Sequence, residues 1–207
     1  MPFTPYDAAV HSIARTKAML AHASTVPAPL QDDLRRMGIV MGVAALDTYM
    51  HRLVVHRVYW HDKLPKGIAK LTMDFEYALA QADESAELAR AAPANTRPRV
   101  PLKRALRDRL LRDSFQTFES VSNALAMAGL KKAWSSIGAA MAPQQDSEQI
   151  KERLNVIVRR RNQIAHEGDY VRLEKPQTAR VNDISQADAD LDVAYLEDLI
   201  DAIHTIY

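Results

Sequence analysis

Apolar residues recur three and four positions apart along most of this chain, and proline-containing breaks separate the repeating stretches. This spacing places apolar side chains on one face of a helix. No stretch alternates strongly enough to predict a strand, and Tyr170 to Leu173 is too short to change the class. The pattern predicts helices over residues 5–23, 30–61, 68–90, 102–128, 131–141, 147–166 and 191–203. We therefore expect an all-α protein.

The helix predicted over 147–166 has the clearest pattern of core and surface positions. Ile150, Leu154, Ile157 and Val158 recur at helical spacing and are expected to form its buried face. Gly168 suits the left-handed residue that often ends a helix, which places the residues just before it in the last turn.

Composition narrows the class of protein and the kinds of site. Apolar residues make up 47% and charged residues 26% of the 207 positions, which is ordinary for a globular protein. The absence of cysteine excludes disulfides and thiolate metal sites, and it fits a cytoplasmic location. Neither a secretory signal nor an apolar run near the ~20 residues of a membrane span is evident, so no membrane partner is expected.

Three histidines on the second predicted helix do not predict a metal site. His51, His56 and His61 are each five positions apart, which rotates each about 140° from the last at roughly 100° per residue. Helical zinc ligands need a spacing such as four. We expect these histidines to be surface or interface residues, and we expect neither a metal nor another cofactor.

The end of the helix over 147–166 carries the residues with the most chemistry. It reads Arg161-Asn162-Gln163-Ile164-Ala165-His166-Glu167-Gly168. Asn162 and His166 are four apart and lie on one helical face, whereas Arg161 lies about 140° from His166. A single helix therefore aims Arg161 and His166 at one phosphate only with difficulty. Two copies of the helix packed together would bring an arginine and a histidine close. Cations also favour helix C-termini in proteins without such a site.

This segment resembles the Arg-x4-6-His motif of the HEPN superfamily, in the form typical of the RiboL-PSP-HEPN group. Ala45-Leu46-Asp47 also resembles the helix that carries an acidic residue in this superfamily. The resemblance implies an up-and-down helical bundle with additional helices and a metal-independent endoribonuclease. It also implies a homodimer whose motif residues line a shared cleft, and products with 2′,3′-cyclic phosphate and 5′-hydroxyl ends. Phage defence or a toxin role, with a cognate antitoxin or sensor protein as partner, follows from the same analogy.

Each candidate residue has a chemical role and an ordinary alternative. His166 would act as general base on the 2′-hydroxyl or general acid on the leaving oxygen, and Arg161 would bind the phosphate. Asn162 would orient His166 or the phosphate, or else cap a neighbouring helix. Asp47 would pair with Arg161 or fix the tautomer of His166, or else be an ordinary solvated or ion-paired carboxylate.

The net charge of +1 hides an uneven distribution. Arg104 and Arg107 belong to a basic stretch over 97–112, and Arg159 and Arg160 add a second basic group. These side chains could follow an RNA backbone, or they could be solvated helix faces. The segment after Arg180 is acidic and is not expected to contact RNA.

We predict a single HEPN-like domain over residues 1–207, with 63–101 as a candidate insertion. Two classes of function remain open from sequence alone. The first is the RNA-cleaving homodimer. The second is a non-enzymatic helical dimer that binds nucleic acid or a partner protein through the same arginine and histidine surface.

Overall fold

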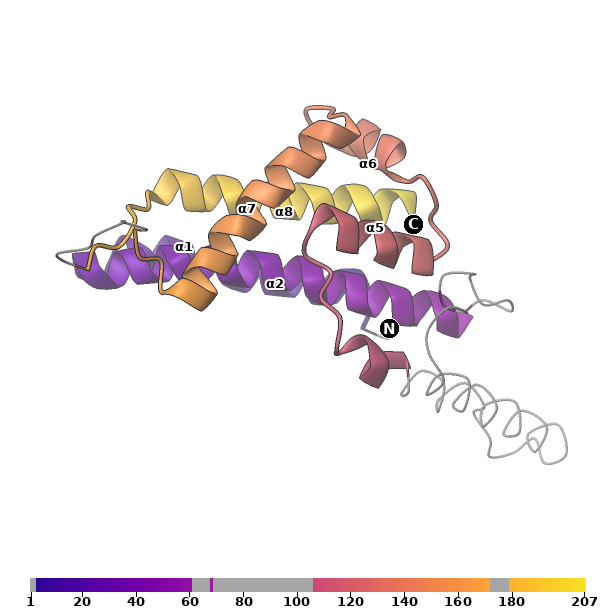
Figure 1. Cartoon of the computed structure of the whole chain (residues 1–207), viewed down its shortest axis with the longest axis horizontal. Coiled ribbons are helices and arrows are strands. Elements are labelled where there is room, and N and C mark those ends of the chain that lie inside the picture. The colour runs from indigo at the N-terminus through magenta and orange to yellow at the C-terminus, as the bar shows by residue number, and fades with distance from the viewer. Residues whose placement is uncertain (1–2, 61–67, 69–105, 172–178) are drawn as a thin grey trace, which may run out of the picture. The chain divides into compact units, whose positions relative to one another are not determined.

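A computed structural model describes residues 3–60, 68, 106–171 and 179–207. These residues are mainly helical, and the only strand-like feature among them is an isolated antiparallel bridge between Tyr170 and Val181. The all-α prediction is confirmed (Figure 1). The helices are α1 (Pro5–Ala23), α2 (Ala28–Trp60), α5 (Phe118–Met127), α6 (Trp134–Ala140), α7 (Ser147–Glu167) and α8 (Gln186–Ile206).

The predicted helix boundaries hold for some elements and fail for others. The first helix has the predicted bounds, and α8 begins at Gln186 rather than Leu191 because the Ser185 hydroxyl accepts a hydrogen bond from the amide of Asp188. The single helix predicted over 102–128 is wrong. Residues 106–110 are helical, the chain leaves the helix over 111–117, and α5 then begins at Phe118. The predicted helix over 68–90, the candidate insertion and Arg104 lie outside the described residues.

The chain divides into two compact units. One comprises Met1–Tyr49, Gln116–Phe118 and Lys132–Tyr207, and therefore holds α1, the first part of α2, α6, α7 and α8. The other comprises Met50–Phe115 and Glu119–Lys131. Its described core is formed by buried aliphatic side chains: Leu53, Val54, Leu106, Leu110, Val121 and Leu125.

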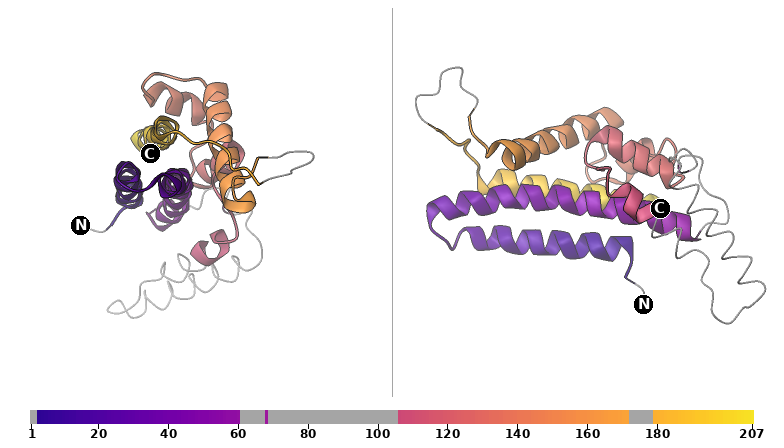
Figure 2. Two further views of the ribbon diagram at one scale, coloured as in Figure 1. Left: turned by 90° about the vertical axis from the view of Figure 1, so that its left-hand side faces the viewer. Right: turned by 60° about the horizontal axis from the view of Figure 1, so that its bottom comes forward.

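Three helices of the first unit lie side by side in both views of Figure 2: α1, the first part of α2, and α8. Near the start of α1 the Tyr6 hydroxyl donates to Asp201 at 2.9 Å, and its ring stacks on His204 with centroids 4.0 Å apart. Because Tyr6 begins α1 while both partners lie near the end of α8, these two helices run antiparallel.

Small residues on α2 let its neighbours approach closely. A Cβ atom at Gly42 would lie 3.0 Å from Leu196 Cδ1 of α8, and one at Gly38 would lie 2.5 Å from Leu20 Cδ2 of α1. The core beneath these contacts is fully buried and aliphatic, so hydrophobic burial holds the unit together. Its members include Ile13, Ile39, Val43, Leu46, Leu154, Leu199 and Ile203.

The helix that carries the motif is fixed at both ends and along its inner face. The Asp146 carboxylate accepts from the amides of Glu148 and Gln149 at 2.9 and 2.8 Å and caps the start of α7. The predicted inner face is confirmed, since Ile150, Leu154, Ile157 and Val158 are all buried. Gly168 adopts the expected left-handed conformation, with φ 62° and ψ 20°, at the end of the helix.

An ion pair attaches the outer side of α7 to α8. Arg153 Nη2 donates to Asp192 Oδ1 at 2.7 Å. Burial raises the pKa of the Asp192 carboxyl above its ordinary value, and the positive charge of Arg153 opposes this shift. The neighbouring Tyr195 hydroxyl donates to Gln145 at 3.2 Å, and burial raises the pKa of that phenol to about 12.

One helical segment, Ala28–Arg57, is long and apolar enough to cross a membrane by length and composition alone, with a mean hydropathy of 1.2. The sequence-based expectation that no apolar run approaches that length is therefore wrong. Within this segment, 61% of the 18-residue stretch that meets the hydropathy criterion is buried inside the protein, as is typical of the central helix of a globular fold.

Gly138→Ala tests the packing of α6. A Cβ atom there would lie 2.0 Å from the carbonyl oxygen of Gln145, whose amide already donates to Gly138 at 3.1 Å. Alanine favours an isolated helix by about 1 kcal/mol, but we expect a net loss of about 1–3 kcal/mol in the free energy of unfolding from the backbone clash. Urea unfolding followed by circular dichroism measures this, with the exposed Ser136→Ala as control. Equal stability of Gly138→Ala and the wild type would contradict the packing described.

Candidate functional site

His166 and Asn162 lie on the exposed side of α7, in agreement with their spacing of four. His166 is in the last turn of the helix, just before the left-handed Gly168. The residue is exposed, and within the described part of the chain its imidazole makes no hydrogen bond and no ion pair. The side chain is therefore available to a substrate or to a second copy of the chain.

Arg161 is half-buried and is only partly paired. Its Nη1 donates to Asn162 Oδ1 at 2.8 Å, while its Nε is buried and has no hydrogen-bond partner. Asn162 thus holds the guanidinium of Arg161 rather than His166 within one chain. The alternative in which Asn162 caps a neighbouring helix does not occur among the described residues. A buried N–H without an acceptor costs about 1–3 kcal/mol of stability. Arg161 therefore carries a donor that the protein itself does not use, at a cost in stability.

Three consecutive arginines precede His166. Each is separated from His166 by four to six intervening residues, so each one fits the Arg-x4-6-His pattern. The fold gives them different environments, because each step along the helix turns the side chain by about 100°. Arg159 is exposed, Arg161 holds Asn162, and Arg160 forms two hydrogen bonds with Asp169 at 2.5 and 2.9 Å. A contact from Arg160 to RNA stays a prediction, but it would require exchange of its carboxylate partner for phosphate.

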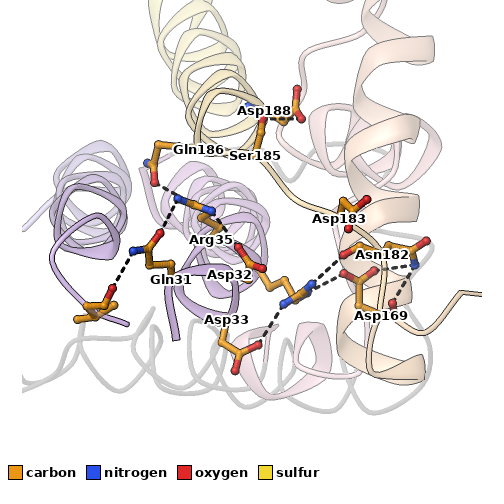
Figure 3. A network of polar contacts seen from close by, with 12 residues as sticks. Gln31, Asp32, Asp33, Arg35, Asp169, Asn182, Asp183, Ser185, Gln186 and Asp188 are labelled. Carbon is orange, nitrogen blue, oxygen red and sulfur yellow. Dashed lines mark hydrogen bonds and ion pairs between the residues drawn. The ribbon is translucent and has the colours of Figure 1, made fainter. Parts of the chain in front are cut away.

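Asp169 is a residue that sequence reasoning missed. It is fully buried, and it adopts a left-handed conformation with φ 59° directly after Gly168. Besides the two bonds from Arg160, its Oδ2 accepts from Arg36 Nε of α2 at 2.7 Å. The amide and the side-chain Nδ2 of Asn182 also donate to the Asp169 carbonyl, at 2.9 and 2.8 Å (Figure 3). We name Arg36, Arg160, Asp169 and Asn182 the Asp169 cluster.

The Asp169 cluster joins three segments at the end of the motif helix. Arg36 comes from α2, Arg160 from the last part of α7, and Asp169 from just after the end of α7. Asn182 comes from the chain that leads into α8, and Figure 3 labels it beside Asp169. Arg36 Nη2 also donates to the Asn182 carbonyl at 2.8 Å. One sequence signal pointed to this site: an Asp after a helix-ending Gly readily adopts the left-handed region. Its two arginine partners were not evident, because Arg36 is distant in sequence and the turn after Gly168 that brings Asp169 back to Arg160 depends on the fold.

A second arginine of α2 extends this network toward α8. Arg35 donates to Asp32 at 2.8 Å, to Gln31 at 3.1 Å and to Gln186 in the first turn of α8 at 3.2 Å (Figure 3). The adjacent guanidiniums of Arg35 and Arg36 therefore hold both ends of the connection between α7 and α8.

The supporting acid and the other basic residues do not join His166 within one chain. Asp47 accepts a hydrogen bond from Gln116 at 3.3 Å, and neither Arg161 nor His166 bonds to it. Its expected pairing with Arg161 or His166 is absent from this structure of one chain and stays a prediction. Arg107 is exposed and belongs to the other compact unit. No group of three or more His, Asp or Glu side chains suited to a metal ion occurs among the described residues.

Asp169→Asn tests the energetic importance of the Asp169 cluster. Removal of the carboxylate charge leaves Arg160, whose side chain is 21% exposed, without a counter-ion, and it leaves Arg36, 12% exposed, with only the surface carboxylate of Asp33. We expect a loss of about 3 kcal/mol in the free energy of unfolding, the lower end for breaking a buried pair, because asparagine keeps one acceptor oxygen. Chemical unfolding measures this loss.

Asp183→Asn is the matched control on the same segment. That side chain is 95% exposed and its pair with Arg180 is 3.6 Å long, so its replacement is expected to change stability by less than about 0.5 kcal/mol. If both variants lost similar stability, the special role of Asp169 would be refuted.

Comparison with known proteins gives one match. No curated protein and no solved structure matches the chain. The sequence model of the RiboL-PSP-HEPN family matches residues 12–207. That range includes the whole of α2 and α7, and so every described residue of the site. The chain therefore belongs to the RiboL-PSP-HEPN family, whose HEPN domains are generally ribonucleases, and this membership indicates an RNA-related, nuclease-type function.

Proposed function

We propose that this protein is a metal-independent endoribonuclease that acts as a homodimer. Attack of a 2′-hydroxyl on the adjacent phosphate would give 2′,3′-cyclic phosphate and 5′-hydroxyl ends. The observation that carries the proposal is the buried Nε of Arg161, which has no hydrogen-bond partner. The guanidinium is held by the next residue, Asn162, and the exposed His166 lies on the same helix.

The unpaired edge of Arg161 suits a phosphate. Its Nη1 is occupied by Asn162, and the Nε on the other edge has no partner. Because this Nε is buried, the guanidinium must turn outward before Nε and Nη2 form a two-pronged contact. Guanidinium binds phosphate strongly in this bidentate geometry. The same contact stabilises the charge that develops on the phosphorus oxygens in the transition state.

His166 supplies the proton transfer. Its imidazole would take the proton of the 2′-hydroxyl as that oxygen attacks phosphorus, or give a proton to the 5′-oxygen as the P–O bond breaks. Neither step needs a metal ion, since the cation at the phosphate is Arg161. The solvent-exposed position of His166 permits access of a polymer substrate.

The geometry of α7 favours a two-fold assembly. Leu154, Ile157 and Val158 are buried in the chain's own core, which leaves the opposite side of the helix for a partner. That side also carries Val156, an apolar residue that is 51% exposed. A two-fold contact uses the same patch on both copies, so it would bring two His166 side chains to one cleft. Arg161, four residues after the buried Ile157, would enter that cleft from the edge of the helix.

The biological setting is proposed from the family. A ribonuclease of this kind would serve in phage defence or as the toxin of a toxin–antitoxin pair, in the cytoplasm. A cognate antitoxin or sensor protein would then control it. Arg159 and Arg107, both exposed, are proposed to contact the RNA backbone, which predicts binding that weakens with salt.

Cleavage of single-stranded RNA in EDTA tests the mechanism. We expect wild-type protein to cut, His166→Ala to be slower by about 10²–10⁴-fold, and Arg161→Ala by about 10²–10³-fold. The 5′-hydroxyl ends are detected by enzymatic phosphorylation of the products. Glu152→Ala, an exposed change on the same helix, serves as the control for handling and folding. Activity lost in EDTA and restored by a divalent ion would overturn the mechanism.

Mixing inactive variants tests the shared cleft. If a working centre takes Arg161 from one subunit and His166 from the other, a dimer of one His166→Ala and one Arg161→Ala chain keeps one complete pair. Random reassociation makes about half of the dimers mixed, so recovery of about a quarter of wild-type activity is expected. The variants are unfolded, mixed and refolded together before the assay. A monomer by analytical ultracentrifugation, or a dimer with the two His166 side chains on opposite outer surfaces, would refute the proposed assembly.

A further inference from the structure

Tyr170 is an exposed aromatic residue close to the end of the motif helix. Its exposed fraction is 51%, although most of the large apolar and aromatic side chains of this unit are buried. The backbone around it is well anchored, because Tyr170 pairs with Val181 and the Val171 amide donates to the Arg180 carbonyl at 2.7 Å. Its exposure therefore does not come from a loosely attached chain.

The Tyr170 ring lies against the last turn of α7. A Cβ atom at Gly168 would be 3.1 Å from Tyr170 Cε2 and 3.3 Å from Cδ2, so the ring packs directly beside the Gly168 backbone. Gly168 follows His166 by two residues. The ring is thus held at the same helix end as the proposed proton-transfer group.

The Asp169 cluster fixes the backbone next to Tyr170. Asp169 is the residue between Gly168 and Tyr170, and its buried carboxylate is held by Arg36 and Arg160. The Asn182 amide and side chain bind the Asp169 carbonyl from the opposite segment. An aromatic ring on so constrained a backbone loses little conformational entropy when a ligand covers it.

A cation and an apolar side chain lie on the segment paired with Tyr170. Val181 is opposite Tyr170 in the bridge and is 37% exposed. The Arg180 side chain is 70% exposed, and its contact with the almost fully exposed Asp183 is 3.6 Å long. Solvent weakens such an exposed pair, so Arg180 is available to an anion. An exposed aromatic ring and an exposed cation on two paired segments form a combination suited to single-stranded nucleic acid.

We propose that Tyr170 is a base-stacking residue: its ring stacks on a nucleobase next to the scissile phosphate, and Arg180 contacts the neighbouring backbone. This inference rests on the proposed ribonuclease function and deepens it, because it assigns the substrate contact that places a nucleotide beside His166. Since every base has a stacking face, Tyr170 sets affinity and position more than sequence preference. The substrate class is single-stranded RNA with an unpaired base at this position.

The test separates binding from cleavage by use of the inactive His166→Ala protein. Fluorescence of a single-stranded RNA containing 2-aminopurine reports stacking, and anisotropy reports affinity. Tyr170→Leu in this background is expected to weaken binding by about tenfold, the scale of one lost base–aromatic stack, and to abolish the 2-aminopurine quenching. Tyr170→Phe keeps the ring and is expected to bind within about twofold of the parent.

Phe3→Leu is the matched control, since it also replaces an exposed aromatic residue by leucine, before α1. It is expected to leave both RNA signals unchanged. Photo-crosslinking of 4-thiouridine RNA to the His166→Ala protein, with Tyr170 intact, gives a second measurement that does not depend on folding of a Tyr170 variant. A cross-linked peptide containing Tyr170 supports the proposal.

The outcomes distinguish this inference from the proposed function. Binding that depends on Tyr170 in a protein that never cleaves RNA would support the stacking role and overturn the nuclease. Cleavage that continues with equal affinity in Tyr170→Leu would overturn the stacking role alone. A change in dimerisation by Tyr170→Leu, with RNA binding unaltered, would assign the ring to a protein contact instead and would also overturn it. If neither the His166→Ala parent nor any of the variants bound RNA, both proposals would be overturned.

Discussion

A single buried carboxylate organises the region around the candidate site. Asp169 has no exposed surface, and it accepts hydrogen bonds from two guanidiniums that come from different helices. In a medium of low dielectric a carboxylate is tolerated only when charges and donors surround it, and each arginine in turn needs that carboxylate. The end of α7, the start of α2 and the segment before α8 therefore have only one good arrangement.

This arrangement explains how three adjacent arginines acquire different roles. Helical rotation turns Arg160 toward Asp169, leaves Arg159 in solvent and places Arg161 where Asn162 can hold it. The guanidinium of Arg160, which has several partners, contributes to structure. The guanidinium of Arg161 is the one suited to a ligand, because a phosphate would satisfy the buried Nε that the protein itself leaves unpaired.

The same helix has a closed side and an open side. Its apolar side is buried in the core, and Arg153 attaches it to α8 through Asp192. Its other side carries Asn162, His166 and the exposed Val156 without an intramolecular covering in the described chain. A rigid helix with reactive groups on the open side is a suitable frame for chemistry shared between two copies, since the positions are fixed before the partner arrives.

The sequence by itself determined the helical class, the bounds of the first helix, the buried face of α7 and the left-handed end at Gly168. These properties are local: they depend on spacings of three and four residues and on the conformational freedom of glycine. The motif likewise pointed to the family that the comparison then established. The break between 110 and 118 was missed because no proline or glycine marks it, and the apolar spacing continues across it.

Only the tertiary structure decided which arginine is available and what holds the end of the motif helix. Arg36 and Asp169 are 133 positions apart in sequence, and no local rule links them. Burial decides the role of such groups, because a carboxylate in solvent needs no partner whereas a buried one requires several. The sequence pointed to Arg161 and His166 as candidate site residues, and the fold determined which of their neighbours are already paired.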